Sequence, residues 1–341
     1  MKKQLLVLIW ILVATEAWAQ SSFYQGKTIT VLAAASAGSA YDLYARLMAQ
    51  FMGKHIPGNP NFVVQNMTGA GSIIGANYLY NVSKPDGLTI GAVQPSIYFN
   101  QLMKQKEVKY DWAKFGWIGS SDKSDYLLYM RADLPYKTLA DVRKAKEPPK
   151  CGSTGAGTSG SYMPKVLEEP LGTKFTIVAG YQGGGEIDLA VERGELHCRA
   201  FTIQAYHSRE PYHTWRKKGF AHILMQTGQT RDPRLADVPT LHELMDEFKT
   251  SEADRRLVPM VLAATDFGRP IIAPPGIPAD RMKILREAFL KTMKDPDLLA
   301  EAKRKNFDIT PSSGEELEAL AKHVMSQPPE IVERVKVLMK Q

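Results

Sequence analysis

The 341-residue chain has only two cysteines, Cys151 and Cys198. After residue 19, no stretch approaches 18 consecutive apolar residues. A helix that spans a bilayer needs about 20 such residues, so we expect none in the mature chain. The two cysteines cannot complete a metal coordination sphere, because no histidine stands at ligand spacing from them. A metal site is therefore not expected.

The sequence also lacks blocks of one charge. Its 43 Lys and Arg residues exceed its 36 Asp and Glu residues, which gives a formal net charge of +7. The basic residues are spread along the chain, without an Arg/Lys block and without interleaved aromatic residues. This distribution argues against nucleic acid as a partner and favours a mild attraction for small anions.

Common enzyme motifs are missing as well. The sequence contains no G-x-S-x-G elbow, no H-E-x-x-H and no G-K-[ST] phosphate loop. The histidines are scattered, and His207 and His213 fall in a predicted surface loop. Asp122, Asp125 and Asp266 could supply carboxylates, but the sequence shows no paired arrangement. The sequence therefore points to no catalytic residue and to no cofactor.

The N-terminus predicts export. Two lysines precede the short apolar run 5–14, and Ala17 and Ala19 supply the small residues that a signal peptidase reads. We interpret residues 1–19 as a secretory signal peptide, because the apolar run is too short for a membrane anchor. The expected destination is a bacterial periplasm.

An oxidising compartment allows the two cysteines to form a disulfide. Each of Cys151 and Cys198 lies at or near a segment that is predicted to be a strand. A disulfide is the favoured interpretation in a secreted chain, and two buried free thiols are the alternative.

A strand that runs through a loop of small residues into a helix dominates the first part of the chain. The run 29–32 is apolar and β-branched, residues 33–40 carry no bulky side chain, and Leu43, Leu47 and Phe51 follow at helical spacing. A bare loop at a helix start is a ready anion site, because unpaired N–H groups and the helix dipole favour negative charge. An ordinary strand–helix connection is the alternative.

The same pattern recurs later in the sequence. Predicted strands at 62–66 and 88–93 complete one βαβαβ unit. A second unit is expected from a strand near Cys151 through the loops 153–161 and 180–185 to a strand at 196–201. The second unit roughly repeats the order of strands, loops and helices of the first. Two such units imply two α/β lobes with a cleft between them.

Two further features are candidates for ligand contact. Gly155–Gly160 matches the spacing of a dinucleotide fingerprint, but no acidic residue ends the next strand, and nicotinamide cofactors are not supplied outside the cell. Hydroxyl and N–H groups around these glycines could instead bind a carboxylate. Arg269 precedes a proline and could hold a carboxylate bidentately, with a surface salt bridge as the alternative.

Four stretches together resemble the Bug-type periplasmic receptors of tripartite tricarboxylate transporters. They occur in the family's order and extend over nearly the whole mature chain. They are Gly38–Arg46; Val64–Ser72 with 75–77 and 85–90; Gly152–Ser159 with 180–184 and 193–196; and 235–240 with 273–278.

The resemblance implies an α/β, two-lobed periplasmic-binding-protein fold, in which each lobe is a mostly parallel sheet flanked by helices. Residues 20–122 plus 259–341 would form the first lobe and residues 123–258 the second. The implied function is a monomeric receptor that binds a small carboxylate, either a di- or tricarboxylate or an aromatic acid, in the interlobe cleft. Hinge closure would then deliver the ligand to membrane transporter subunits.

The resemblance and the loop chemistry together give the expected ligand site. Its members come from the first strand–helix loop, from the facing loop of the second lobe and from a few residues beside them. They are Ala35, Ser36, Ala37, Gly38, Ser39, Ala40, Tyr41, Gln94, Ser153, Thr154, Gly157, Thr158, Ser159, Tyr181 and Arg269.

Departures from the family pattern leave the ligand open. The first loop is rich in alanine where the family usually has paired glycines, His197 stands where an acidic residue is common, and the two cysteines are not general. Aromatic residues near the expected cleft leave room for an aromatic ring in the ligand. They are Tyr41, Tyr98, Phe99, Tyr162 and Tyr181.

Two other functions fit the same cleft. An exported enzyme that acts on a carboxylate would need a base with a perturbed pKa facing the ligand. A receptor that serves a sensor, without a transporter of its own, would have the same pocket and a different partner.

Overall fold

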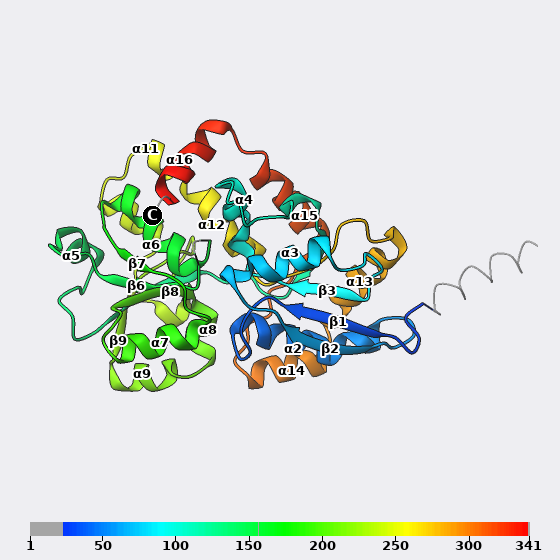
Figure 1. Cartoon of the computed structure of the whole chain (residues 1–341). Coiled ribbons are helices and arrows are strands. Elements are labelled where there is room, and N and C mark those ends of the chain that lie inside the picture. Colours follow the sequence, from blue (N-terminus) through cyan, green and yellow to red (C-terminus); the bar gives the residue numbers. More distant parts are fainter. Residues whose placement is uncertain (1–22, 156, 340–341) are drawn as a thin grey trace, which may run out of the picture.

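The computed structural model describes residues 23–155 and 157–339. The chain forms two mixed β-sheets side by side, each flanked by helices (Figure 1). The predicted signal peptide, residues 1–19, lies outside the described residues. Among the residues that are described, no helix has both the length and the apolar character needed to cross a membrane.

The first sheet has six strands in the order β11-β4-β10-β3-β1-β2. Strand β1, next to the edge strand β2, pairs in parallel with β2 and β3. Strand β10 is antiparallel to β3 and β4, and β11 is antiparallel to β4. The strands are β1 (Thr28–Ala33), β2 (Asn61–Asn66), β3 (Thr89–Ala92), β4 (Gly116–Ser120), β10 (Pro270–Ala273) and β11 (Ser312–Ser313).

The second sheet has five strands in the order β7-β6-β8-β5-β9. Strand β6 pairs in parallel with β7 and β8, and β5 is antiparallel to β8 and β9. The strands are β5 (Tyr126–Arg131), β6 (Lys150–Gly152), β7 (Thr176–Val178), β8 (Cys198–Thr202) and β9 (Ala221–Gln226).

These sheets confirm the two-lobed α/β fold class and refine one part of it. Both sheets are mixed rather than mostly parallel. The chain crosses from the first sheet to the second between β4 and β5, and it returns to the first sheet at β10. Strands that are not joined by a βαβ crossover have no need to run parallel to their neighbours.

The predicted echo between the two halves is confirmed at the level of topology. The first half contributes the strand order β2-β1-β3, and the second half contributes β7-β6-β8, each from a βαβαβ segment. The parallel strands of each half therefore end in loops at one edge of their sheet, where ligands of α/β proteins bind.

Helices cover both faces of the first sheet. On one face, buried side chains of α2, α13 and α14, among them Phe289 of α13, form an apolar cluster with Ile29 and Val31 of β1. On the other face pack α3, α12 and α15. The elements are α2 (Ala40–Met52), η1 (Gly53–His55), η2 (Ala70–Ser72), α3 (Ile73–Asn81), η3 (Pro95–Ile97), α4 (Tyr98–Leu102), η4 (Trp112–Lys114), α12 (Val258–Phe267), α13 (Ala279–Thr292), α14 (Pro296–Arg304) and α15 (Gly314–Met325).

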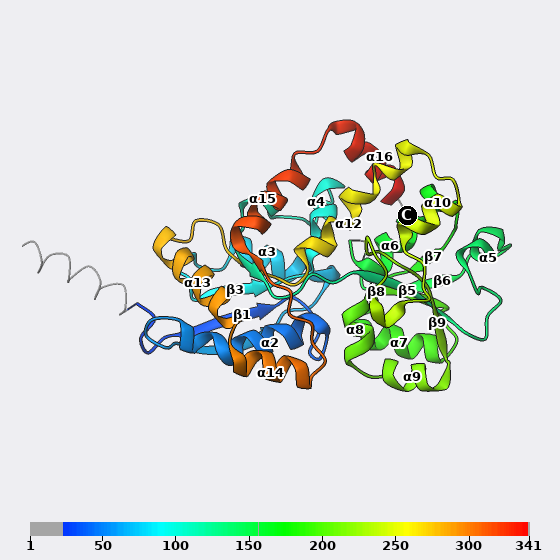
Figure 2. The same ribbon diagram turned by 180° about the vertical axis from the view of Figure 1, so that it is seen from behind.

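The remaining helices surround the second sheet, as Figures 1 and 2 show from opposite sides. Helix α16 packs on α6, where Arg334 forms ion pairs with Glu169 at 2.8 Å and Asp254 at 2.6 Å. The last helix thus reaches the second lobe. The elements are α5 (Leu139–Lys144), α6 (Ser159–Leu171), α7 (Gly184–Glu192), α8 (Ile203–Ser208), α9 (Tyr212–Lys218), η5 (Pro233–Leu235), α10 (Leu241–Glu247), α11 (Glu252–Arg255) and α16 (Pro329–Met339).

The prediction of a disulfide is confirmed. Cys151 on β6 and Cys198 on the neighbouring strand β8 are bonded, with their Cα atoms 4.5 Å apart, and both are fully buried. The predicted loop around His207 and His213 is wrong, because His207 lies in α8 and His213 in α9. Buried Tyr206, Tyr212 and Trp215 hold these two short helices on an apolar cluster of the second lobe.

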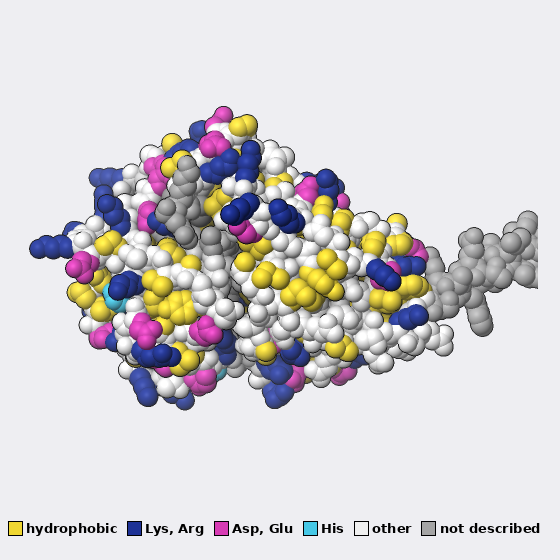
Figure 3. All heavy atoms as spheres, viewed as in Figure 1, with side chains coloured by type: hydrophobic (Ala, Val, Ile, Leu, Met, Phe, Trp, Pro, Cys, Tyr) yellow, Lys and Arg dark blue, Asp and Glu magenta, His cyan; other side chains and the backbone are white. Residues whose placement is uncertain are grey.

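Charges are mixed on the surface. On the face shown in Figure 3, Lys and Arg side chains are interspersed with Asp and Glu side chains and do not gather in one basic patch.

Candidate functional site

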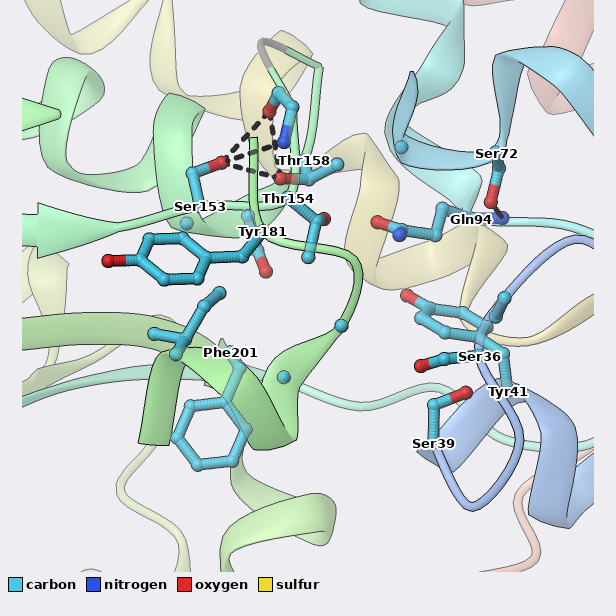
Figure 4. A pocket seen from close by; sticks show the side chains of 18 of the residues that line it. Ser36, Ser39, Tyr41, Ser72, Gln94, Ser153, Thr154, Thr158, Tyr181 and Phe201 are labelled. Atoms are coloured by element: carbon cyan, nitrogen blue, oxygen red, sulfur yellow. Dashed lines mark hydrogen bonds between the residues drawn. The ribbon is translucent and has the colours of Figure 1, made fainter. Parts of the chain in front are cut away.

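A cavity of about 340 Å³ lies between the two lobes, and strand–helix loops of both line it (Figure 4). From the first lobe come the segments 34–36 and 39–41, the loop 68–72 and Gln94. From the second lobe come 153–155, the start of α6, the loop 180–184 and the end of β8. A cavity of this volume can take a small organic molecule.

The start of α2 is organised by one buried carboxylate. Asp42 Oδ2 accepts hydrogen bonds from the Gly38 N–H at 2.8 Å and from Arg46 Nε at 3.0 Å, and its Oδ1 accepts from Asn66 Nδ2 at 2.8 Å. Burial alone would raise the pKa of Asp42, but these hydrogen bonds outweigh it and lower the pKa. Ser39 caps the helix by accepting from the Asp42 N–H at 3.4 Å.

This capping leaves donors for a ligand. The N–H groups of Ala40 and Tyr41 are at the first two helical positions, where no intrahelical acceptor exists. Of the expected site residues in this loop, Ala35, Ser36, Ser39, Ala40 and Tyr41 line the cavity. Residues 37 and 38 (Ala37 and Gly38) form the exposed tip of the loop and do not line it.

The facing loop of the second lobe is held together by its own hydroxyl groups. Ser153 Oγ lies 2.9 Å from Thr158 Oγ1 and accepts from Ser161 Oγ at 2.7 Å and from the Gly155 N–H at 3.2 Å. Thr158 and Ser161 also donate to the Gly155 carbonyl. We expected these hydroxyls to face a ligand, but the hydrogen bonds show that they brace the loop instead.

The backbone of this second loop offers the free donors. Ser161 and Tyr162 donate their N–H groups to the Thr158 carbonyl, so the N–H groups of Ser159 and Gly160 at the first two positions of α6 have no helical acceptor. The second loop therefore presents a helix start with free N–H groups like that of the first, across the cavity from it, and such a helix start favours negative charge.

Most of the expected residues in the second lobe line the cavity, and one does not. Ser153, Thr154, Thr158, Ser159 and Tyr181 are in the wall, as is Gln94 opposite them. Gly157 is buried away from the cavity, where a Cβ atom would lie 1.8 Å from Asn100 Oδ1. Its small size allows contact with the first lobe and does not serve a ligand.

The two lobes also touch beside the cavity. A Cβ atom on Gly183, the N-cap residue of α7, would lie 2.4 Å from Ser36 Oγ of the first lobe. A Cβ atom on Gly71 would lie 2.6 Å from Thr158 Cγ2 of the second lobe. A larger residue at either place would force the Ser36 or Thr158 side chain to move, and Gly71 in addition has a positive φ of 61°.

Arg269 reaches the cavity wall but is already engaged. Its Nε lies 3.3 Å from Asp122 Oδ2, and its Nη2 donates to Gln204 Oε1 at 2.8 Å. Its guanidinium also stacks on the rings of Tyr41 and Tyr44, with centroids at 5.4 and 4.3 Å. Nη1 is buried without a hydrogen-bond partner. Arg269 therefore ties the crossover segment at Asp122 to the second lobe, while both its Nη1 and its Nε lack a hydrogen-bond partner.

Asp122 is the carboxyl group near the cavity whose pKa is raised most. Burial raises its pKa to about 6, although the Arg269 guanidinium opposes that rise. Its side chain is fully buried, and Asp122 does not form part of the cavity wall. Thr310 donates to its other oxygen at 3.1 Å. This carboxyl group thus belongs to the crossover between the lobes.

Sequence analysis missed several wall residues. The loop 68–72 lines the cavity but was not among the expected site residues, and neither were Arg199, Phe201 and Arg209. Arg199 Nη1 pairs with the buried Asp188 at 2.7 Å, and its guanidinium lies over the Phe201 ring at 4.7 Å. Arg199 and Phe201 stand two residues apart on β8, so alternation along that strand could have marked both, whereas Arg209 lies beyond the strand.

Three of the five expected aromatic residues lie elsewhere. Tyr41 and Tyr181 line the cavity. Tyr98, Phe99 and Tyr162 are fully buried in an apolar cluster that runs between the lobes, with the Phe99 and Tyr162 centroids 5.2 Å apart. Their apolar surface is used for packing and is not available to a ligand.

Comparison with known proteins places this geometry among its relatives. The family model described as "Tripartite tricarboxylate transporter family receptor" matches residues 44–337. A curated Agrobacterium vitis protein is 30% identical over 305 residues, which are 85% of this chain and 76% of that protein. It carries the description "UPF0065 protein in the TAR-I ttuE-ttuC' intergenic region".

Solved structures share the fold. The periplasmic binding protein BugD matches with a TM-score of 0.72 and 19% identity, over 92% of this chain and 98% of its own. MatC from Rhodopseudomonas palustris, with bound malate, matches with a TM-score of 0.69 and 19% identity over 92% and 99%. An R. palustris protein with adipate matches with a TM-score of 0.71 and 19% identity over 91% and 97%.

Proposed function

Because the chain belongs to the receptor family of the tripartite tricarboxylate transporters, we propose that it is a periplasmic receptor that binds a small carboxylate between its two lobes. The observation that carries this proposal is the cavity wall. Starts of α2 and α6 from opposite lobes meet there, three arginines line it, and its described residues include no Asp or Glu. Such a wall favours an anion.

The ligand would also join the two lobes. We propose residues 20–122 plus 259–341 and residues 123–258 as the bodies that move, with α16 as a contact that spans them. An anion held by helix starts of both lobes binds the closed form better than the open form, so it shifts the hinge equilibrium toward closure. Membrane subunits of the transporter would then recognise the closed form of the monomer, after the signal peptide, residues 1–19, has been removed.

Two neighbours support the choice of a carboxylate as the ligand. One is bound to malate and the other to adipate, both of them dicarboxylates. At 19% identity these neighbours support the ligand class only through the shared fold. Whether this chain takes an aliphatic or an aromatic acid is decided by its own wall residues.

The enzyme alternative would need a base that faces the ligand. Asp122 has the required raised pKa, but its carboxyl group is buried behind Arg269. The described wall residues supply hydroxyl, amide, guanidinium and backbone groups. These groups suit binding better than proton abstraction.

A thermal-shift screen of the mature protein tests the proposal. The panel would contain di- and tricarboxylates, aromatic acids and amino acids, and the mass of each hit would be checked after overnight incubation. A ligand at 100 times its Kd adds about 2.7 kcal/mol to the free energy of unfolding, so a carboxylate should raise the melting temperature and remain intact. Consumption of the hit would favour the enzyme, and no shift with any carboxylate would overturn the proposal.

A further inference from the structure

The three arginines in the cavity wall differ in how their charge is balanced. Arg269 faces Asp122 at 3.3 Å, and Arg199 faces Asp188 at 2.7 Å, so a buried carboxylate accompanies each of these cations. Arg209 has no carboxylate within ion-pair distance among the residues that the structure describes. The second-lobe side of the wall therefore carries one uncompensated positive charge.

The surroundings of Arg209 leave its guanidinium available. Arg209 lies between α8 and α9, with its Cζ atom 5.4 Å from the centroid of the Tyr212 ring. Its Nη2 has only a 3.5 Å hydrogen bond to the Tyr212 hydroxyl, and its Nε is buried without a hydrogen-bond partner. The adjacent Glu210 accepts instead from the Thr214 N–H at 3.2 Å and lies 3.9 Å from His213 Nδ1.

The Tyr212 hydroxyl group does not supply the missing charge. It donates to Asp188 Oδ2 at 2.6 Å, and Asp188 already pairs with Arg199. A partly buried guanidinium with an unused donor is costly unless an anion joins it. The cavity is the open side from which such an anion can come.

Arg209 lies at a different part of the wall from the start of α6. The ring of Tyr212, which Arg209 overlies, is 4.8 Å from the Phe201 ring. In Figure 4, Tyr181 lies between the Ser153–Thr158 loop and Phe201. An apolar band of Tyr181, Ile187 and Phe201 therefore separates the start of α6 from the Arg209 end of the wall.

We propose that Arg209 binds a second anionic group of the ligand and selects molecules with an acidic group at each end and an apolar middle. This inference rests on the proposed function, because it takes the first carboxylate to sit at the start of α6. The apolar band would contact the aliphatic chain or ring between the two acids. A ligand with two anionic ends and an apolar middle matches the wall, in which the apolar band lies between the start of α6 and Arg209.

The test compares acids that differ only at one end. Matched pairs of increasing length are succinate and butyrate, adipate and hexanoate, suberate and octanoate, and terephthalate and 4-methylbenzoate. Calorimetric Kd values would be measured for the wild-type chain, for Arg209→Gln and Arg209→Lys, and for Arg193→Gln. Arg193 is 63% exposed on the second lobe, so its replacement removes the same charge away from the cavity. Thermal unfolding would check that each variant folds.

The wild-type chain should bind the diacid of at least one pair more tightly than the monoacid. Arg209→Gln should weaken that diacid roughly 10- to 100-fold, since a hydrogen bond to a charged group is lost, and should leave the monoacid within threefold. Arg209→Lys should give an intermediate loss, because lysine keeps the charge without the planar fork. Arg193→Gln should change neither Kd beyond threefold.

Other results separate the two proposals. Equal losses for diacid and monoacid in Arg209→Gln, or no loss for the diacid, would overturn the role of Arg209 and leave the carboxylate receptor standing. A wild-type chain that binds monoacids as tightly as diacids would do the same. A wild-type chain that binds no acid of any pair would overturn both proposals.

Discussion

The loop after β1 and the loop after β6 occupy equivalent places in the two βαβαβ units, and each leads into a helix of 13 residues. The first loop is braced at its base by a charge, the Asp42 carboxylate, which joins Gly38, Arg46 and Asn66. The second loop is braced from within by neutral hydroxyls around Ser153. The two loops thus share their backbone topology but not the chemistry that holds them.

The strands behind the loops differ as well. A disulfide joins β6 to β8 in the second unit, whereas β1 is joined to β3 in the first unit by hydrogen bonds alone. Equal strand order therefore does not require equal reinforcement. We expect the second loop to hold its shape independently of pH, and the first loop to depend on the ionisation of one carboxyl group.

The largest expected effect concerns the disulfide. Its cysteines are 47 residues apart, and closing a loop of that length constrains the unfolded chain by about 4 kcal/mol in the entropy model. Reduction should lower the free energy of unfolding in urea by about that amount. The Kd for a carboxylate should change less than threefold, because neither cysteine lines the cavity.

The double variant Cys151→Ala with Cys198→Ala is the control for this measurement. Reductant should not change its unfolding curve, so any remaining effect of reductant would have another cause. A loss below about 1 kcal/mol in the wild-type chain would show that packing around β6 and β8, and not the covalent bond, holds this half together.

A smaller effect is expected from removing one hydroxyl in each loop. Ser153→Ala leaves Thr158, Ser161 and the Gly155 N–H short of a buried partner, which costs about 1 to 3 kcal/mol of folding free energy. Ser39→Ala removes one long cap bond and should cost about 1 kcal/mol or less. Urea unfolding of the two variants measures the difference.

Measuring the Kd for a carboxylate adds a second comparison of Ser153→Ala with Ser39→Ala. Ser153→Ala should also weaken the carboxylate, because the N–H groups of Ser159 and Gly160 lose the loop that orients them. Thr230→Ala removes an exposed hydroxyl outside the cavity wall and leaves both braces intact, so it is the control. Equal losses of stability for Ser153→Ala and Ser39→Ala would contradict the idea that the second loop depends more on its hydroxyls.

Local patterns were enough to predict much of this molecule. The strands, the small-residue loops and the helix start at Ala40 follow from apolar runs and glycine placement, which are short-range signals. Helix α6 begins at Ser159, within the predicted loop 153–161. The sequence could not tell the wall from its surroundings. Ala37 has the same side chain as Ala35 but stands at the exposed tip of the loop with Gly38, and Gly157 lies against the other lobe.

For the arginines too, the sequence alone does not tell which side chains line the cavity. Arg269 could be selected because it precedes a proline beside a strand, but its partners Asp122 and Gln204 come from distant segments. Arg209 lay in a region that was predicted to be a loop, and the packing of α8 and α9 on the second sheet brings it to the cavity. Tertiary packing decides which arginine side chain reaches the cavity, and the spacing of residues in the sequence does not predict that packing.

The smallest expected effect tests the charged brace of the first loop. The pKa of Asp42 is lowered in the folded state, so its ionised form stabilises folding at pH values above its unfolded pKa of about 3.9. That contribution should be lost as the pH falls below about 4 and through the lowered pKa. Replacing the carboxylate in Asp42→Asn should cost about 1 kcal/mol at pH 7, because the amide keeps part of the hydrogen bonding.

Urea unfolding of the wild-type chain and Asp42→Asn between pH 7 and pH 3 measures this effect. The difference in free energy between the two chains should shrink toward acid pH, since Asp42 becomes protonated in the wild-type chain. The same difference between the wild-type chain and Ser153→Ala should stay constant, because hydroxyls do not titrate in this range. If both differences fell together, acid would be loosening the whole molecule, and the charged and neutral braces could not be distinguished by pH.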